Sequence, residues 1–482
     1  MAVASLFRVF GFLLIGLAVA QLLPLAVAFG FNEPTGTAAF GLGAGVSMFF
    51  GVVLVIAGTG GSRKIGRRDA VVLAVGAWIL LSLFAAVPFL VGEATGGIPG
   101  AIVEATSGLT TTGLTLFADA GAIARSTVVW RAVLQWLGGF ATVLFAASLV
   151  PHIGLVSSSG WSAADAPAYA ESFRPRLRQI APAVAATYAG LTFLGLIGLL
   201  ASGLPLLDAA CYAMSVISTG GFVPNTGGPL AYGNDGVLLV LALGMLVGAV
   251  SFTLHWAATS RPSAYLRDPE TGFLLLLVAA GTAIVFVVLA ATPGLASGGW
   301  PLYALFQVVS AASTTGFSDP GQGHVPVFVI ILLAGFTLVG GASASTAGGL
   351  KLMRALLLIR QSARELERLV HPRGVMLIKL GRASVTDATM QSIWAFFVLF
   401  LFCLVLLAAS LSAVGLPFDH ALVLALSAMA NCGPMLLQAA GFGGDMASLS
   451  DAAKLLVAAG MLVGRLEVFT LLILLTPMFW KR

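Results

Sequence analysis

One short polar stretch occurs four times along the chain, and it limits what the chain can fold into. In every copy a serine stands six residues before a glycine. The four copies are Ser107–Leu114, Ser215–Phe222, Ser310–Phe317 and the degenerate Ser427–Pro434. A single such loop could be an ordinary turn between helices, but four copies with one offset, at intervals of roughly a hundred residues, indicate an internal repeat.

Composition places these repeats in a membrane. The chain has 482 residues, of which 59% are hydrophobic and 9% charged, with a mean hydropathy of +1.02. Soluble domains carry about 25% charged residues. Three cysteines form no disulfide framework and no metal-binding spacing. The sequence therefore predicts a polytopic membrane protein with a polar loop in each repeat.

Glycine-containing loops at membrane depth suit the binding of a dehydrated cation. Irregular backbone is tolerated there only where protein buries it or water lines it. Carbonyl oxygens aimed at a common axis can replace the water shell of the cation. Glycine allows the backbone angles that this arrangement needs. The four loops are therefore predicted to face one pore.

The loops divide the chain into an N-terminal helix pair and four repeats. Each repeat is predicted to be a span, a helix too short to cross the bilayer, the loop and a second span. The predicted fold is an all-α polytopic membrane protein with four span–pore-helix–span repeats around a pseudo-fourfold pore, preceded by two extra transmembrane helices. The predicted units are residues 1–60 (helix pair), 69–160 (repeat 1), 174–260 (repeat 2), 268–360 (repeat 3), 361–387 (basic cytoplasmic linker) and 388–482 (repeat 4).

Basic residues gather in the connections that this topology places on one side. They lie in residues 63–68, 174–178, 261–267, 351–382 and 481–482. Short loops rich in Lys and Arg are typically cytoplasmic. The N- and C-termini are therefore predicted to be cytoplasmic, and the first apolar segment is expected to be a span rather than a cleaved signal peptide.

Each second span contains a pair of residues in which the first is glycine and the second is usually small, and a break in the span is predicted at each pair. The pairs are Gly138-Gly139, Gly248-Ala249, Gly340-Gly341 and Gly464-Arg465. Close packing of helices could explain such pairs. The third pair begins ten consecutive small residues, Gly340–Gly349, which form a poor helix. This glycine-rich segment is predicted to be irregular and able to move, because small residues make few side-chain contacts. It is therefore a candidate gate.

Two charged residues inside the apolar segments require an explanation. Arg465 takes the position that Gly139, Ala249 and Gly341 hold in the other repeats, so it is predicted to reach into the pore. The alternative is a structural pair with a carboxylate such as Glu467. Glu104, in the first short helix, is expected either to hold the loop through a pair or to face the ion path, with the structural role favoured.

Taken together, these motifs resemble the TrkH/TrkG members of the Trk/Ktr/HKT superfamily of potassium transporters. The resemblance covers nearly the whole chain, including the N-terminal pair, the four loops, the glycine-rich segment and Gly464–Glu467. It implies potassium uptake across the bacterial inner membrane through a channel-like pore. It also implies a homodimer and a cytosolic ring of TrkA-type nucleotide-binding subunits, which we expect to dock on or near the basic stretch Lys351–Arg382.

The resemblance assigns roles to the loop residues. In that family four filter glycines select potassium, and Gly113, Gly221, Gly316 and Gly433 match them. A serine at the first of these accompanies sodium permeation in some relatives, and Gly113 departs from that pattern. The expected potassium-binding residues are Thr111, Thr112, Gly113, Thr219, Gly220, Gly221, Thr314, Thr315, Gly316, Asn431, Cys432 and Gly433. The expected gate residues are Gly340, Gly341, Ser343, Ser345, Thr346, Gly348, Gly349 and Arg465.

Two other classes of function compete with this interpretation. A sodium- or proton-coupled secondary cation transporter of lower potassium selectivity would use clustered intramembrane acids. The candidate acids are scattered instead over Glu104, Asp208, Asp419 and Glu467. A membrane enzyme is not expected, because the five histidines show no metal spacing and no nucleophile motif occurs. Potassium is expected as substrate, with no bound cofactor and no nucleic-acid partner.

Overall fold

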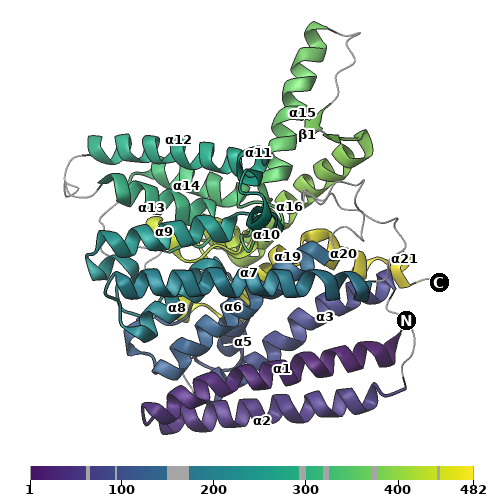
Figure 1. Cartoon of the computed structure of the whole chain (residues 1–482), viewed down its shortest axis with the longest axis vertical. Helices are drawn as coiled ribbons and strands as arrows, with labels where there is room; N and C mark the ends of the chain where they lie inside the picture. Colours follow the sequence, from purple (N-terminus) through teal and green to yellow (C-terminus); the bar gives the residue numbers. More distant parts are fainter. Residues whose placement is uncertain are drawn as a thin grey trace.

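The structure, a computed structural model, is a bundle of helices (Figure 1). It describes residues 2–60, 66–92, 95–148, 173–292, 300–317, 325–371, 378–380, 383–441 and 446–480. Arg63, Lys64, Arg382, Lys481 and Arg482, on which part of the charge argument rests, lie outside the described residues. The predicted all-helical, polytopic class is confirmed. Among these residues the strands are β1 (Lys379–Leu380) and β2 (Ala383–Ser384), an antiparallel pair in which Lys379 faces Ser384.

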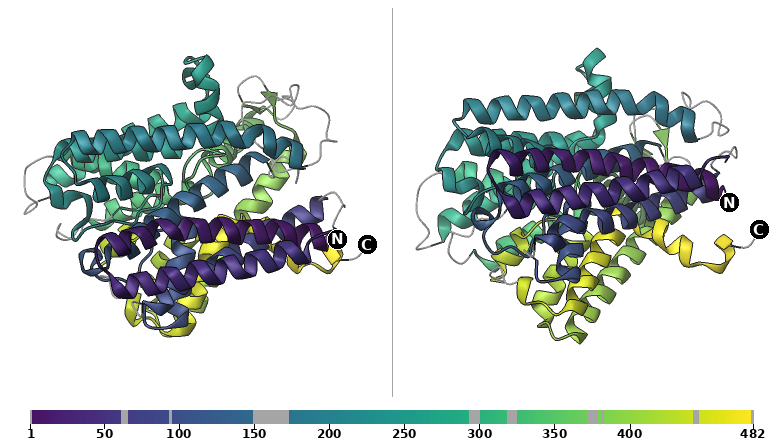
Figure 2. Two further views of the ribbon diagram at one scale, coloured as in Figure 1. Left: turned by 60° about the horizontal axis from the view of Figure 1, so that its bottom comes forward. Right: turned by 90° about the horizontal axis from the view of Figure 1, so that it is seen from below.

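The two N-terminal helices form an antiparallel hairpin along one face of the bundle (Figure 2). They are α1 (Val3–Gly30) and α2 (Pro34–Ala57). Glycines allow the two helices to pack closely, because a Cβ added at Gly11 would lie 2.6 Å from the carbonyl oxygen of Gly51. Large apolar side chains such as Phe29 and Phe49 are exposed on this hairpin. This exposure is expected of a surface that faces lipid.

Each repeat contributes a first span and a short helix. The first spans are α3 (Arg67–Ala85) continued by α4 (Val87–Val91), α7 (Phe173–Ala201), α12 (Pro269–Ala291) and α16 (Asp387–Ala413). The short helices are α5 (Ile98–Leu109), α8 (Leu206–Ile217), α13 (Trp300–Ala312) and α17 (Phe418–Met429). At 12 or 13 residues, the short helices cannot cross a hydrocarbon layer of about 30 Å.

The second spans differ among the repeats. They are α6 (Arg125–Ser148), α9 (Asp235–Ala249) with α10 (Phe252–Ser260), α14 (Val327–Val339), and α19 (Asp451–Arg465) with α20 (Val468–Leu475). The second and fourth bend by 96° and 108° at their breaks. The third ends at Val339, before the glycine-rich segment, and the chain continues as α15 (Leu352–Val370).

The second span of repeat 1, helix α6, has no break at its glycine pair, although a break is predicted in every repeat. Gly138 and Gly139 lie inside the continuous helix α6, so the prediction is wrong there and the packing alternative holds. A Cβ at Gly138 would lie 1.8 Å from the carbonyl oxygen of Leu109, the last residue of α5. Gly464 makes the same close approach to Met429 in repeat 4, at 2.1 Å. The repeated glycine therefore lets the second span pass against the end of its own short helix.

Seven helices of the described residues are long and apolar enough to cross a membrane, or nine if each bent pair counts as one span. The ten spans that the sequence predicts include residues 326–358, where α14 has only 13 residues before the irregular segment. The helix α15 extends beyond the other helices (Figure 1). The remaining elements are α11 (Ala264–Arg267), α18 (Met435–Ala439), α21 (Pro477–Trp480) and the 3-10 turns η1 (Ala120–Ala122), η3 (Gly228–Tyr232) and η4 (Met446–Ser448).

Candidate functional site

The four polar loops come together in order around a common centre. Loop 1 (110–114) touches loop 2 (218–222), because a Cβ added at Gly113 would lie 2.2 Å from the carbonyl oxygen of Gly220. Loop 2 touches loop 3 (313–317) in the same way, since a Cβ at Gly221 would lie 2.1 Å from the carbonyl oxygen of Thr315. No side chain larger than hydrogen fits at either glycine without movement of the neighbouring loop.

The remaining two contacts close the ring. A Cβ at Gly316 would lie 2.2 Å from the backbone nitrogen of Gly433, so loop 3 touches loop 4 (430–434). The side-chain amide of Asn431 donates a hydrogen bond of 3.0 Å to the Thr112 hydroxyl, which joins loop 4 to loop 1. The chain thus brings together all four predicted loops, which lie about a hundred residues apart, in one buried ring.

The loops share a strained backbone. Residues two positions after each short helix have a positive φ: Thr111 (55°), Thr219 (51°), Thr314 (57°) and Asn431 (50°). This left-handed conformation costs a non-glycine residue about 1–2 kcal/mol. The glycines of the first three loops also have a positive φ, at 82°, 82° and 72°, whereas Gly433 does not. The loop that is degenerate in sequence is therefore also the one that differs in backbone.

The repeated serine ties each loop back to its short helix. Its carbonyl oxygen accepts from the turning backbone in all four loops, for example from Thr112 N to Ser107 O at 2.9 Å. Its hydroxyl reaches the far end of the loop in three of them: Ser215 accepts from Gly221 N (3.1 Å), Ser310 donates to Phe317 O (3.3 Å), and Ser427 donates to Gly433 O (3.5 Å). The constant six-residue offset is therefore explained by this anchoring.

The glycine-rich segment Gly340–Gly349 lies directly against three of the loops. The Thr346 hydroxyl accepts from the Thr219 hydroxyl of loop 2 at 3.3 Å and donates to Ile217 O at the end of α8, at 2.9 Å. Gly348 N donates to the Thr314 hydroxyl of loop 3 at 2.7 Å. Gly349 N donates to Ala430 O at 3.1 Å. The segment is irregular, as predicted, and hydrogen bonds join it to the loops. Its backbone hydrogen bonds replace the side-chain contacts that small residues lack.

Arg465 contacts this segment. Its guanidinium is 5% exposed and donates through Nε to the Thr142 hydroxyl (2.7 Å) and through Nη1 to Thr346 O (2.8 Å). The alternative pair with Glu467 is wrong, because Glu467 accepts from Arg354 Nη2 of α15 at 2.5 Å. The two residues flank the break between α19 and α20, where Glu467 has a positive φ of 55° and the chain bends by 108°.

Glu104 has the structural role that the sequence favoured. It is fully buried, lies 3.5 Å from Arg131 Nε, and accepts from the Thr115 hydroxyl and from Leu116 N. The carboxylate therefore holds the chain just beyond loop 1.

Sequence reasoning missed two further contacts. Gln135 of α6 donates from Nε2 to Gly220 O at 2.5 Å, across 85 residues. Glu270, in the first turn of α12, accepts from Ser343 N at 2.7 Å and so holds the glycine-rich segment. A glutamine inside an apolar span is a visible signal, but an acid in a first helical turn resembles a common helix start.

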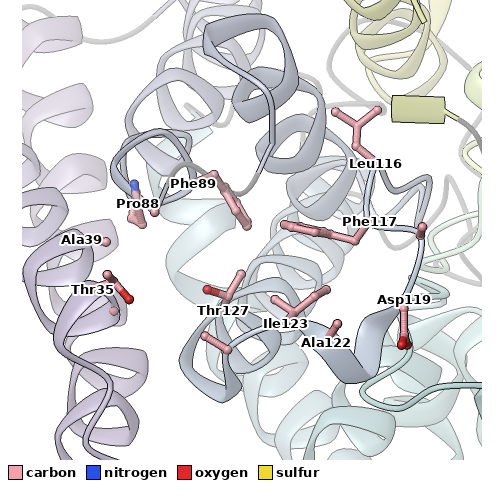
Figure 3. A pocket seen from close by; sticks show the side chains of 14 residues that line it. Thr35, Ala39, Pro88, Phe89, Leu116, Phe117, Asp119, Ala122, Ile123 and Thr127 are labelled. Atoms are coloured by element: carbon pink, nitrogen blue, oxygen red, sulfur yellow. The ribbon is translucent and has the colours of Figure 1, made fainter. Parts of the chain in front are cut away.

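A separate pocket of about 510 Å³ lies between α2, α4 and the chain beyond loop 1. Phe89, Phe117, Ile123 and Thr127 surround it (Figure 3). Asp119 stands at one side, where it accepts hydrogen bonds from Thr226 and from Gly121 N, and these bonds lower the pKa of its carboxyl. The pocket does not include the residues of the ring.

Comparisons with known proteins agree with the fold. The family model "TrkH: Cation transport protein" matches residues 38–482. The chain is 31% identical over 486 residues to the Trk system potassium uptake protein TrkH of Halomonas elongata, covering 100% of both chains. It is 33% identical over 497 residues to TrkI of the same organism, covering 99% of this chain and 97% of the relative. The crystal structure of the potassium transporter TrkH from Vibrio parahaemolyticus matches with a TM-score of 0.89 and 29% identity, covering 100% of each chain.

Proposed function

The chain belongs to the TrkH family of cation transport proteins, and on that premise we propose that it takes up potassium through the ring of four loops. The observation that carries the proposal is the closure of that ring, in which Gly113, Gly221 and Gly316 each lie against the backbone of the next loop. Asn431 joins loop 4 to loop 1. Relatives bear the name potassium uptake protein. The expected location is the bacterial inner membrane. The proposed boundaries of the helix pair, the four repeats and the linker are those that the sequence predicts.

The proposed filter residues are the twelve loop residues predicted from the sequence, Thr111 to Gly113, Thr219 to Gly221, Thr314 to Gly316 and Asn431 to Gly433. Carbonyl oxygens of these loops would replace the hydration shell of the ion. The negative ends of the four short-helix dipoles point toward the same region, which favours a cation. The geometry of Gly433 differs from the other three glycines, so we expect loop 4 to contribute least to selectivity.

The proposed gate consists of the segment Gly340–Gly349 together with Arg465. The segment lies against loops 2, 3 and 4, and Arg465 holds it through Thr346 O. A buried guanidinium repels a cation strongly where water is scarce. In the proposed closed state the segment obstructs the path sterically and the arginine does so electrostatically.

Helix α15 is the proposed docking element for partners. It follows the gate directly, it projects from the bundle, and its outer half combines basic residues with exposed apolar side chains (Figure 1). Ile359, Leu366 and Val370 are exposed at spacings that place them on one helical face. We propose that this region contacts a second copy of the chain or the TrkA-type cytosolic subunit.

The coupled secondary transporter receives no support from the arrangement of acids. Glu104 is paired with Arg131, Glu467 with Arg354, and Asp208 accepts from the Tyr232 hydroxyl at 2.6 Å. Among the described residues no group of three His, Cys, Asp or Glu could hold a metal ion. These three acids therefore have separate partners and do not lie in one cluster.

Uptake of rubidium by cells that lack their own potassium uptake systems tests the proposal. We expect saturable rubidium uptake that potassium inhibits and an equal concentration of sodium does not. The external pH and sodium concentration are varied at constant membrane potential. A rate that requires sodium or a proton gradient would favour the coupled transporter instead.

A further inference from the structure

We propose that Glu104 and Arg131 form a buried charged pair that positions the outer ends of loops 1 and 2 and thereby sets ion selectivity. Both are positioning residues, since neither belongs to the twelve loop residues of the ring. The inference rests on the proposed function, because selectivity can be measured only if the ring conducts cations.

Glu104 anchors the chain immediately after loop 1. It lies on α5, three residues before the serine anchor Ser107, and is fully buried. One carboxylate oxygen accepts from the Thr115 hydroxyl at 2.6 Å and from Leu116 N at 2.5 Å. These residues stand two and three positions after Gly113. The carboxylate therefore fixes where the outer end of loop 1 leaves the ring.

Arg131 connects this anchor to loop 2. It lies on α6, is 2% exposed, and its Nε stands 3.5 Å from the second oxygen of Glu104. Its guanidinium carbon lies 4.0 Å from the ring centroid of Phe222, the residue directly after Gly221. It also lies 5.3 Å from the ring centroid of Phe117. One guanidinium thus contacts the chain beyond loop 1 and the end of loop 2.

Among the four repeats, only repeat 1 carries this charged pair. At the position of Glu104 the other repeats carry Tyr212, Gln307 and Leu424, and at the position of Arg131 they carry Leu241, Leu333 and Val457. Tyr212 makes a comparable contact without a charge, since its hydroxyl donates to Asn225 Oδ1 beyond loop 2 at 2.5 Å. The other repeats therefore fill the position of Arg131 with apolar side chains.

Stability alone does not account for a charged pair at this place. The cost of removing two charges from water offsets most of their mutual attraction, and apolar residues of similar volume often stabilise as well or better. The pair does, however, supply two hydrogen bonds to the chain just beyond loop 1 and a cation–π contact to Phe222 at the end of loop 2. Because Gly113 packs against loop 2 with no spare space, a shift of either outer end alters the spacing of carbonyl oxygens in the ring.

The test measures selectivity in purified protein reconstituted into liposomes. Uptake of radioactive rubidium and sodium is compared for the wild type, Glu104→Gln and Arg131→Lys, with protein amount and thermal stability measured in parallel. We expect the rubidium-to-sodium ratio to fall at least tenfold in the folded variants, while the maximal rubidium rate changes less than threefold. A merely structural role would change stability and protein amount but leave the ratio of the remaining folded protein intact.

A matched control comes from a half-buried pair elsewhere in the structure, Arg354 and Glu467. Glu467→Gln removes a carboxylate near the proposed gate rather than behind the ring, so it is expected to leave the ratio unchanged. Should Glu104→Gln fail to fold, Phe222→Leu tests the inference instead. It removes the contact between Phe222 and Arg131 and leaves the pair of Glu104 and Arg131 in place. Unchanged selectivity in Phe222→Leu and Arg131→Lys would overturn the inference. A wild type without preference for rubidium would instead overturn the proposed function.

Discussion

Replacing Arg465 with alanine tests the proposed gate most directly. The guanidinium donates one hydrogen bond to Thr346 O, inside the glycine-rich segment, and one to Thr142 on α6. It therefore fastens the segment to a helix that has no break. Alanine removes both bonds and the positive charge, and it leaves the twelve loop residues unchanged.

The size of the effect follows from the bond to Thr346. A hydrogen bond from a charged donor contributes about 1.5–3 kcal/mol. If that bond is made only while the segment obstructs the path, its loss shifts the balance toward the open state by roughly ten- to a hundredfold, at a factor of ten for every 1.4 kcal/mol. Removal of the buried charge acts in the same direction, because it lowers the electrostatic barrier to a cation. We therefore expect Arg465→Ala to raise the rate of rubidium uptake at least tenfold when the wild type is mostly closed.

The assay is initial rubidium uptake in liposomes at a fixed potential, normalised to the amount of folded protein. Thr142→Val is the matched control, since it removes the other partner of Arg465 and keeps the bond to the segment; its rate should rise much less. Arg465→Lys retains the charge and separates the electrostatic contribution from the hydrogen bonds. An unaltered rate in well-expressed Arg465→Ala would refute the reasoning and give Arg465 a purely structural role.

Three further predictions concern the ring, the segment and α15. Gly113→Ser should reduce the ratio of potassium to sodium uptake, because φ is +82° and the new Cβ would lie 2.2 Å from Gly220 O; an unchanged ratio would exclude Gly113 from the filter. Deleting Ser343–Ser345 should raise rubidium uptake without changing the preference for potassium over sodium, and equal uptake in stable protein would place the gate elsewhere. Neutralising Arg360, Arg364 and Arg368 should abolish recovery of the TrkA-type subunit in pull-downs from membranes, and full recovery would locate the contact outside α15.

The sequence predicts the architecture well because the features that determine it are local and repeated. The six-residue spacing of serine and glycine is a short-range property, and in the structure Ser215 and Gly221 are joined directly by a hydrogen bond. The spans follow from runs of apolar residues, which predict helices over about 5–29 and 388–413, where α1 and α16 lie. Position in the repeat also distinguishes Arg465 from its counterparts, and in the structure Arg465 contacts Thr346 of the glycine-rich segment.

Partners that lie far apart in the chain could not be predicted in the same way. Gln135 meets Gly220 only because α6 passes behind loop 2, and Arg354 meets Glu467 across 113 residues. The break expected at Gly138 is absent because a glycine pair is compatible with both a break and close packing. The hydrogen bonds of the glycine-rich segment likewise depend on neighbours contributed by other repeats, which composition does not identify.

The contacts of the glycine-rich segment indicate how movement of α15 would reach the pore. Leu352 N, at the start of α15, donates to Gly341 O at 2.9 Å, and Arg354 pairs with Glu467, two residues beyond Arg465. A displacement of α15 therefore acts on the beginning of the segment and on the chain that carries the arginine. Gly348, near the other end, instead donates to the Thr314 hydroxyl of loop 3. The segment is thus bonded to α15 at Gly341 and to the ring at Gly348. We therefore expect changes at Ser343–Ser345 and Arg465 to alter flux while preserving selectivity, and a change at Gly348 to disturb both.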